Sequence, residues 1–221
     1  MSEIKIRLDA VEKRIEIAVQ RCGRTRSDVT LIAVTKVFPV SVILEAYELG
    51  LREFGENYVQ EFQGKAAEVS NLTDARFHLI GHLQSNKSKI ASDLFNVIQT
   101  VDTAKLAQRL EAAGKPLDVF LEVKLSPEDS KNGALPSELS VLIATVKQCP
   151  HLRLAGLMTV PPWSDDPEPS RFYFRQLRLL AEQFGLAALS MGMSHDFEVA
   201  IEEGATHIRV GTALFGRRKK P

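Results

Sequence analysis

The stretch VTLIAVTKVFP, Val29–Pro39, decides how this chain folds. It is apolar up to Thr35 except for its threonines, and Val, Ile and Thr favour the pleated surface of a strand. A run without polar alternation is typical of a parallel strand that is covered on both faces. We therefore predict a buried parallel strand over Thr30–Thr35, followed by a helix that begins at the proline.

Lys36 lies at the carboxyl end of this predicted strand, on the same face as Ile32 and Val34. A lysine at such a place has two interpretations. It either extends its ammonium group to solvent along an apolar stem, or it is held in a pocket for chemistry.

The same alternation of short apolar runs and helical patterns continues along the chain, in units as long as a strand and a helix together. An amphipathic helix opens the chain, with apolar residues at helical spacing from Ile4 to Val19. Further strands are predicted at Glu53–Phe54, Phe77–Ile80, Val97–Thr100, Val119–Val123, Leu154–Met158, Ala188–Met191 and His207–Val210. Helices are predicted at Val40–Leu49, Asn57–Ser70, Thr103–Ala113, Pro136–Gln148 and Ser170–Phe184.

Eight strands that alternate with helices in 221 residues favour a single-domain (β/α)8 barrel of the TIM type, preceded by an extra N-terminal helix. The alternative is an open doubly wound sheet, because periodicity does not reveal whether a sheet closes. No repeat or linker divides the chain, and residues 1–221 are predicted to form one domain.

Composition excludes several classes of protein. Lys plus Arg and Asp plus Glu both number 28, and this zero net charge argues against a nucleic-acid-binding protein. The N-terminus lacks a signal-peptide core, and no apolar run is long enough to cross a membrane. The two cysteines, Cys22 and Cys149, lie far apart in sequence and are expected to be reduced thiols in a cytoplasmic protein.

Small and hydroxyl residues follow the last two predicted strands. The carboxyl ends of the strands form the working face of a barrel, and phosphate groups are often held there after strands seven and eight. Gly192 and Gly211 let backbone N–H groups approach an anion, while Ser194 and Thr212 offer hydroxyl donors. The alternative is that Ser194 only caps the helix that begins near His195 and the glycines only turn the chain.

Lys36 is predicted to lie across the barrel mouth from this phosphate site. Pyridoxal 5′-phosphate (PLP) requires such an arrangement, because its aldehyde forms an imine with a lysine amine while its phosphate is held at the far end. Arg209 is on the same face of its strand as His207 and should point inward, near the pyridine ring. A permanently charged arginine there would oppose protonation of the ring nitrogen. The alternative is that Arg209 forms a salt bridge with Glu202 or Glu203.

Two other features carry weaker signals. His78 and His82 lie in and just after a strand, with no third ligand in sight, and no metal site is predicted. The loop Pro161–Ser170 follows strand six and could cover a site at the carboxyl ends of the strands, although an ordinary surface loop is the simpler interpretation.

Seven motifs along the chain resemble the pyridoxal phosphate homeostasis proteins, single-domain relatives of the barrel half of alanine racemase. The motifs are AVTK (33–36), FGENYVQE (54–61), HLIGHLQSNK (78–87), EDSKNG (128–133), GLMTV (156–160), SMGMSHDFEVAI (190–201) and IRVGTALFG (208–216). The resemblance implies an alanine racemase-like barrel that holds PLP as a Schiff base on Lys36. It also implies phosphate contacts from Ser194, Gly211 and Thr212, a ring-nitrogen contact from Arg209 and a ring-side contact from Asn57.

A racemase of this kind needs a proton-transfer group on each face of the substrate carbon. In alanine racemase the second group is a tyrosine from another domain, and neither Tyr47, Tyr58 nor Tyr173 lies at an obvious strand end here. The first hypothesis is therefore a monomeric protein that acts in PLP and amino-acid homeostasis without robust catalysis, with apo forms of PLP enzymes as candidate acceptors. The alternatives are a weakly active, racemase-like PLP enzyme, with His78, His82 or water as the missing acid, and a cofactor-free lysine aldolase.

Overall fold

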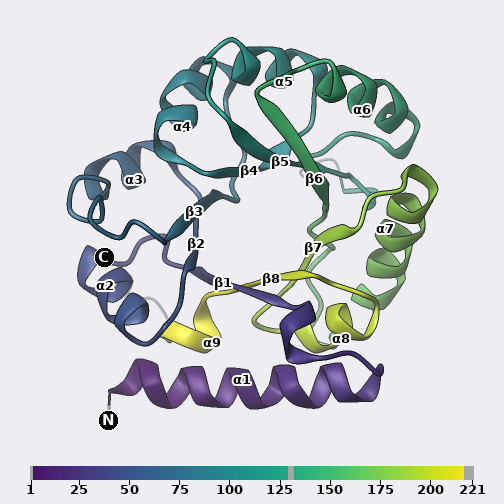
Figure 1. Cartoon of the computed structure of the whole chain (residues 1–221). Coiled ribbons are helices and arrows are strands. Elements are labelled where there is room, and N and C mark those ends of the chain that lie inside the picture. The colour runs from purple at the N-terminus through teal and green to yellow at the C-terminus, as the bar shows by residue number, and fades with distance from the viewer. Residues whose placement is uncertain (1, 129–131, 217–221) are drawn as a thin grey trace.

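Eight parallel strands close into a barrel in the computed structural model, and helices cover its outside (Figure 1). Each strand pairs with the next one in the chain, and β1 pairs with β8 to complete the ring. The structure describes residues 2–128 and 132–216. The predicted (β/α)8 barrel is confirmed. The alternative of an open doubly wound sheet is wrong, because an open sheet has two unpaired edge strands, whereas β1 and β8 pair with each other here.

The strands are β1 (Thr30–Val34), β2 (Glu53–Glu56), β3 (Arg76–Leu79), β4 (Val97–Val101), β5 (Leu117–Glu122), β6 (Leu152–Met158), β7 (Ala188–Met193) and β8 (His207–Val210). The helices are α1 (Glu3–Arg21), α2 (Val40–Glu48), α3 (Val59–Lys65), α4 (Ser88–Leu94), α5 (Ala104–Glu111), α6 (Leu139–Lys147), α7 (Ser170–Phe184), α8 (Phe197–Glu202) and α9 (Thr212–Phe215). The described residues also form 3₁₀ turns, η1 (Arg26–Asp28), η2 (Ser85–Lys87) and η3 (Pro136–Glu138).

Most differences from the predicted elements lie at their ends. The strand that the sequence extends to Thr35 ends at Val34, and the helix predicted over Asn57–Ser70 covers only Val59–Lys65. In contrast, β2 continues to Glu56 because its last residues pair with β3. Part of the EDSKNG motif, residues 129–131, lies outside the described residues.

Alternate residues of each strand face the helices and the barrel interior. On β8, Ile208 and Val210 pack into the main apolar core between strands and helices. Arg209 has the opposite parity and is hydrogen-bonded across the interior to Ser190 of β7. The inward orientation predicted for Arg209 from strand parity is therefore what the structure has.

Helix α1 lies outside the ring, against α8 and α9 (Figure 1). Ser2 caps its N-terminus by accepting a hydrogen bond from the backbone N–H of Lys5 at 3.2 Å. Its buried stripe consists of Leu8, Val11, Ile15, Ala18 and Val19. An ion pair between Arg14 and Glu198, at 2.6 Å, joins the helix to α8. Helix α1 therefore covers the segments that follow β7 and β8.

None of the helices in the described part of the chain has both the length and the apolar composition that a membrane span requires.

Candidate functional site

A cavity of about 320 Å³ lies at the carboxyl ends of the strands. Residues at the carboxyl ends of β1, β2, β3, β6, β7 and β8, or just after them, line it. The six residues that the sequence predicts as cofactor contacts are all in its wall, namely Lys36, Asn57, Ser194, Arg209, Gly211 and Thr212. The structure therefore brings the predicted set together in one place, while the binding role of each residue stays a prediction.

Lys36 is carried by a tight turn between β1 and α2 rather than by the strand itself. The turn is closed by a hydrogen bond from the Phe38 N–H to the Thr35 carbonyl, at 3.1 Å. Val37, the next residue after Lys36, has a φ of 62°, which is strained for a β-branched side chain. Its N–H donates to Glu61 Oε1 at 2.6 Å, and this bond holds the strained backbone in place. The turn is thus fixed on the side away from the cavity.

A buried ionic network lies beneath the Lys36 turn, between the barrel and α3. Lys65 Nζ donates to Glu56 Oε1 at 3.0 Å, to Glu61 Oε1 at 2.6 Å and to the Thr35 carbonyl at 3.3 Å. The Thr35 hydroxyl donates to the same oxygen of Glu56 at 2.8 Å. Burial raises the pKa of the Glu56 carboxyl, although the charge of Lys65 opposes this shift. The network connects the residues on both sides of Lys36 to α3.

Asn57 follows β2 directly and enters the cavity wall beside Gly81. A Cβ atom on Gly81 would lie 2.3 Å from the Asn57 carbonyl oxygen, and only glycine fits there. The side-chain oxygen of Asn57 is buried but has no hydrogen-bond partner within the described residues. A buried amide oxygen of this kind needs a donor, which a bound molecule could provide.

The loops after β7 and β8 are joined by Ser194. Its hydroxyl oxygen accepts hydrogen bonds from the backbone N–H groups of Gly211, at 3.1 Å, and Ala213, at 3.2 Å. The alternative that Ser194 caps the following helix is wrong, because α8 begins at Phe197 with Asp196 at its N-cap. Ser194 thus reaches across to α9, beside the exposed hydroxyl residue Thr212. The predicted phosphate contacts therefore lie side by side.

Arg209 is the buried cation of the site, with only 4% of its surface exposed. Its Nη1 donates to Ser190 Oγ at 2.7 Å and its Nη2 donates to the Thr159 carbonyl at 2.9 Å. Burial lowers its pKa to about 10, against the opposing charges of Asp196 and Glu122, and the guanidinium stays charged at neutral pH.

The alternative of a salt bridge between Arg209 and Glu202 or Glu203 is wrong, because those carboxylates pair with other arginines. No ion pair of Arg209 is found within residues 2–128 and 132–216.

Two aromatic residues that the sequence did not identify as site residues complete the wall. Trp163, from the loop Pro161–Ser170, lines the cavity although 70% of its surface is exposed. Its ring lies against that of His195, with 4.8 Å between the centroids. His195 Nε2 is buried, and it has no hydrogen-bond partner in the described part of the chain. The loop therefore reaches the site, as one of its two interpretations expected.

The other candidate acids lie elsewhere. His78 is inside the barrel, hydrogen-bonded to Glu53 and Gln99, and His82 is exposed, 3.8 Å from Asp102. Neither lines the cavity, and the hypothesis that either is a proton-transfer group of this site is therefore wrong. Tyr58 lies two residues after β2, closer to a strand end than the sequence indicated, but it lines a neighbouring pocket rather than the cavity. Within the described residues no group of three potential metal ligands occurs.

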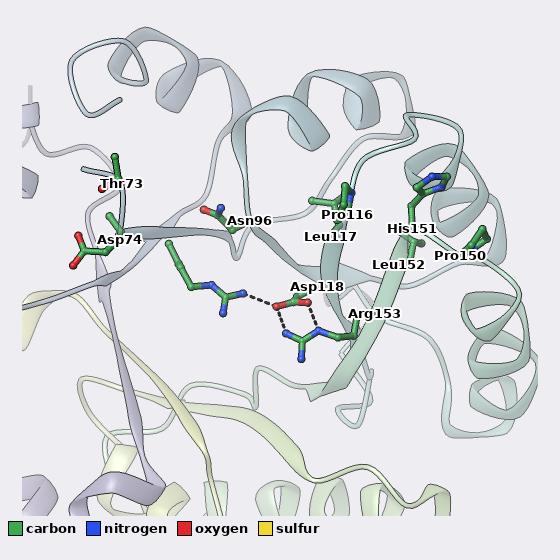
Figure 2. Close-up of a pocket in the computed structure, with 12 residues that line it drawn as sticks. Thr73, Asp74, Asn96, Pro116, Leu117, Asp118, Pro150, His151, Leu152 and Arg153 are labelled. Atoms are coloured by element: carbon green, nitrogen blue, oxygen red, sulfur yellow. Dashed lines mark hydrogen bonds and ion pairs between the residues drawn. The ribbon is translucent and has the colours of Figure 1, made fainter. Parts of the chain in front are cut away.

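A second cavity, of about 630 Å³, lies at the opposite end of the barrel, where β3, β5 and β6 begin. Its central feature is Asp118, which Arg153 contacts through both carboxylate oxygens, and Arg76 contacts one of them (Figure 2). Asp74 lines the same cavity, and its charged side chains, two arginines and two aspartates, therefore sum to zero. None of the predicted site residues lies there.

The carboxyl-end cavity combines groups that suit an aldehyde with an attached phosphate. Lys36 supplies an amine, Ser194 and Thr212 supply hydroxyl groups, and Arg209 supplies a fixed positive charge. The buried Asn57 oxygen still requires a donor. The residues present therefore fit PLP.

Comparison with known proteins identifies the family. The family model of the alanine racemase N-terminal domain matches residues 6–219. The pyridoxal phosphate homeostasis protein of Pseudomonas aeruginosa is 46% identical over 224 residues, which cover 99% of this chain and 97% of that protein. The chain belongs to the pyridoxal phosphate homeostasis protein family. The pyridoxal phosphate homeostasis protein of Aquifex aeolicus is 42% identical to this chain, with 96% of this chain and 97% of that protein covered.

Solved structures place this homeostasis-family chain in the same fold. PipY of Synechococcus elongatus PCC7942 with PLP bound superposes with a TM-score of 0.86 at 37% identity, covering 97% of this chain and 100% of PipY. Alanine racemase from Corynebacterium glutamicum superposes with a TM-score of 0.69 at 18% identity, covering 96% of this chain and 61% of the racemase. The second comparison shows a shared barrel fold only. The resemblance predicted from the seven motifs is confirmed.

Proposed function

We propose that this chain binds PLP in the carboxyl-end cavity, covalently through Lys36, and acts in PLP and amino-acid homeostasis in the cell. The observation that carries the proposal is the meeting of Lys36, Asn57 and Arg209 in one wall of a 320 Å³ cavity. The PLP-bound structure of PipY, at 37% identity, supports the same cofactor. Apo forms of PLP-dependent enzymes are the proposed acceptors.

Each residue has a defined part in this proposal. The Lys36 amine would hold the cofactor through its aldehyde, with loss of water as the bond forms, and water can reverse this attachment. Ser194, Gly211 and Thr212 hold the phosphate, and Asn57 contacts the ring side. Arg209, which is charged and has no carboxylate partner in the described residues, would contact the ring nitrogen and oppose its protonation. When bound, PLP would supply an electron sink for amino-acid chemistry, weakened here by the arginine.

The test is the visible absorption spectrum of the protein after PLP has been added and dialysed away. We expect a retained band in the wild type that is absent from Lys36→Ala. Lys89→Ala is the matched control, because Lys89 is an exposed lysine on α4 that does not line the cavity. Borohydride reduction and peptide mass analysis should place a pyridoxyl group on Lys36. No band in the wild type, or an unchanged band in Lys36→Ala, would contradict the proposal.

A second candidate function, slow PLP-dependent chemistry on amino acids, is favoured by one observation. His195 Nε2 is buried in the cavity wall, without a partner among the described residues, and could exchange a proton with a substrate carbon. The PLP-loaded protein would then exchange the α-proton of amino acids in deuterated water, and His195→Gln would abolish the exchange. If the loaded wild type exchanges no α-proton, this candidate is wrong and the binding function stands alone.

A further inference from the structure

A continuous line of hydrogen-bonded side chains crosses the interior of the barrel. Arg209 Nη1 lies 2.7 Å from Ser190 Oγ, which lies 2.7 Å from Gln99 Oε1. Gln99 Nε2 is 2.9 Å from His78 Nδ1, and His78 Nε2 is 2.5 Å from Glu53 Oε2. The line thus begins in the wall of the carboxyl-end cavity and ends at the first residue of β2, near the opposite end of the barrel.

The line is almost entirely removed from water. Gln99 and Ser190 are fully buried, and His78 and Arg209 are nearly so, while Glu53 keeps contact with solvent. Buried polar groups cost free energy unless each has a partner, and a fully connected network holds its members in one arrangement. In this barrel, positions that apolar side chains usually fill are occupied by a connected polar chain.

The two ends of the line fix the direction of every hydrogen bond. The Arg209 guanidinium can only donate, and Ser190 Oγ therefore accepts from it and donates its own hydrogen to Gln99 Oε1. This leaves the Gln99 amide N–H to donate to His78 Nδ1, and His78 Nε2–H to donate to Glu53. Burial raises the pKa of the Glu53 carboxyl, but the hydrogen bond from His78 and nearby positive charges outweigh it and keep that pKa below its ordinary value. The chain therefore runs from a cation to an anion with all donors aligned.

We infer that Gln99 and Ser190 are positioning residues for Arg209, and that the interior chain sets how its guanidinium meets a ligand in the cavity. Two guanidinium nitrogens are committed to Ser190 Oγ and the Thr159 carbonyl, which fixes the plane of the group. Without the Gln99 acceptor, the Ser190 hydroxyl can rotate and the guanidinium loses its fixed orientation. This inference rests on the proposed PLP-binding function, because the ligand contact of Arg209 belongs to that proposal.

A double-mutant cycle tests whether Gln99 acts through Arg209. Gln99→Leu keeps a similar volume and removes both amide groups, and Arg209→Met removes the guanidinium. The dissociation constant of PLP is measured by equilibrium dialysis, together with the absorption maximum of the bound cofactor. We expect Gln99→Leu to weaken binding about tenfold and to shift the maximum in the wild-type background, since one hydrogen bond to a charged group is affected. In the Arg209→Met background the same substitution should change neither quantity.

Two further variants separate positioning from damage to the core. Ser190→Ala removes a single hydroxyl and serves as the test variant if Gln99→Leu does not fold. It should weaken PLP binding and shift the absorption maximum in the wild-type background, and change neither in the Arg209→Met background. Ser92→Ala is the matched control, since it removes a buried hydroxyl on α4 that donates to the Ser88 carbonyl at 2.9 Å, outside the chain of side chains that crosses the barrel. It should leave PLP affinity and the spectrum unchanged.

The outcomes distinguish this inference from the proposed function. If borohydride traps no pyridoxyl group on Lys36 of the wild type, the proposed function fails and this inference fails with it. If the wild type is labelled but Gln99→Leu and Ser190→Ala weaken binding equally with and without Arg209, the side chains are only structural. That result, or no effect in either background, would overturn the positioning role alone.

Discussion

Replacing Lys65 by methionine tests the ionic network beneath the Lys36 turn. Methionine keeps most of the buried stem and removes the ammonium group, which contacts Glu56, Glu61 and the Thr35 carbonyl. Glu61 is partly exposed and can regain water. Glu56 has no exposed surface, and its carboxylate would be left without a cation. The variant therefore destabilises the protein mainly through this one group.

The size of the effect follows from the protonation of Glu56. A carboxyl group that must be neutral to stay buried costs about 1.4 kcal/mol for each pH unit above its unfolded pKa of about 4.3. This gives a ceiling of about 4 kcal/mol near pH 7 and about 1 kcal/mol near pH 5. The native pKa of Glu56 is already raised, and the wild type therefore carries part of this cost. We expect a loss of about 3 kcal/mol near pH 7, in the range for a broken buried ion pair, and at most about 1 kcal/mol near pH 5.

Urea unfolding of Lys65→Met and wild type at the two pH values measures the difference. The control is Lys65→Met combined with Glu56→Gln, which replaces the stranded carboxylate by a neutral amide that can still accept from Thr35. The double variant should recover most of the loss near pH 7. An equal loss at both pH values, or no recovery in the double variant, would refute the argument that a buried charge at Glu56 is the cause.

Two substitutions test other features of the structure. Val37→Gly should raise the free energy of unfolding by about 0.5–1 kcal/mol in thermal denaturation, because glycine adopts the left-handed backbone without strain and the half-exposed valine loses little packing. A lower stability would mean that the turn is not strained. Glu203→Gln should cost about 1–2 kcal/mol near pH 7, because the buried carboxylate pairs with Arg171 and Arg175. Burial raises the pKa of Glu203, but the arginines outweigh this and keep it below its ordinary value. The pairing therefore stabilises the fold above that ordinary value and is lost as pH falls through the native pKa, and a difference that persists in acid would contradict it.

Much of the fold could be predicted because each strand carries its own local signal. The bounds predicted for β8 and for α7 agree with the structure at both ends, since apolar alternation and a closing glycine mark them. The end of β2 could not be predicted, because Gly55 and Glu56 become strand only by pairing with His78 and Leu79. Closure of the sheet is likewise a property of β1 and β8 together.

The site was partly predictable for a similar reason. Lys36, Ser194 and Arg209 stand next to strand ends, and a strand end in a barrel already implies a position in space. Gln99 carries no such signal, because nothing near it in sequence shows that Ser190, 91 residues away, donates a hydrogen bond to it. For His195 the available signal is its place beside Ser194 in the loop after β7, which indicates a position in the cavity wall. Long-range contacts were the part that the sequence did not reveal.

The pairing of β1 with β8 has a consequence for synthesis of the protein. β1 is synthesised before the strand that completes its second edge, His207–Val210, and β2 to β7 all lie between the two in the chain. Until then β1 and the apolar stripe of α1 lack the segments that cover them, and exposed edges and apolar faces invite association with other chains. Shielding of the nascent N-terminal segment, by a chaperone or by the translation machinery, is therefore most valuable during the long interval before β8 appears.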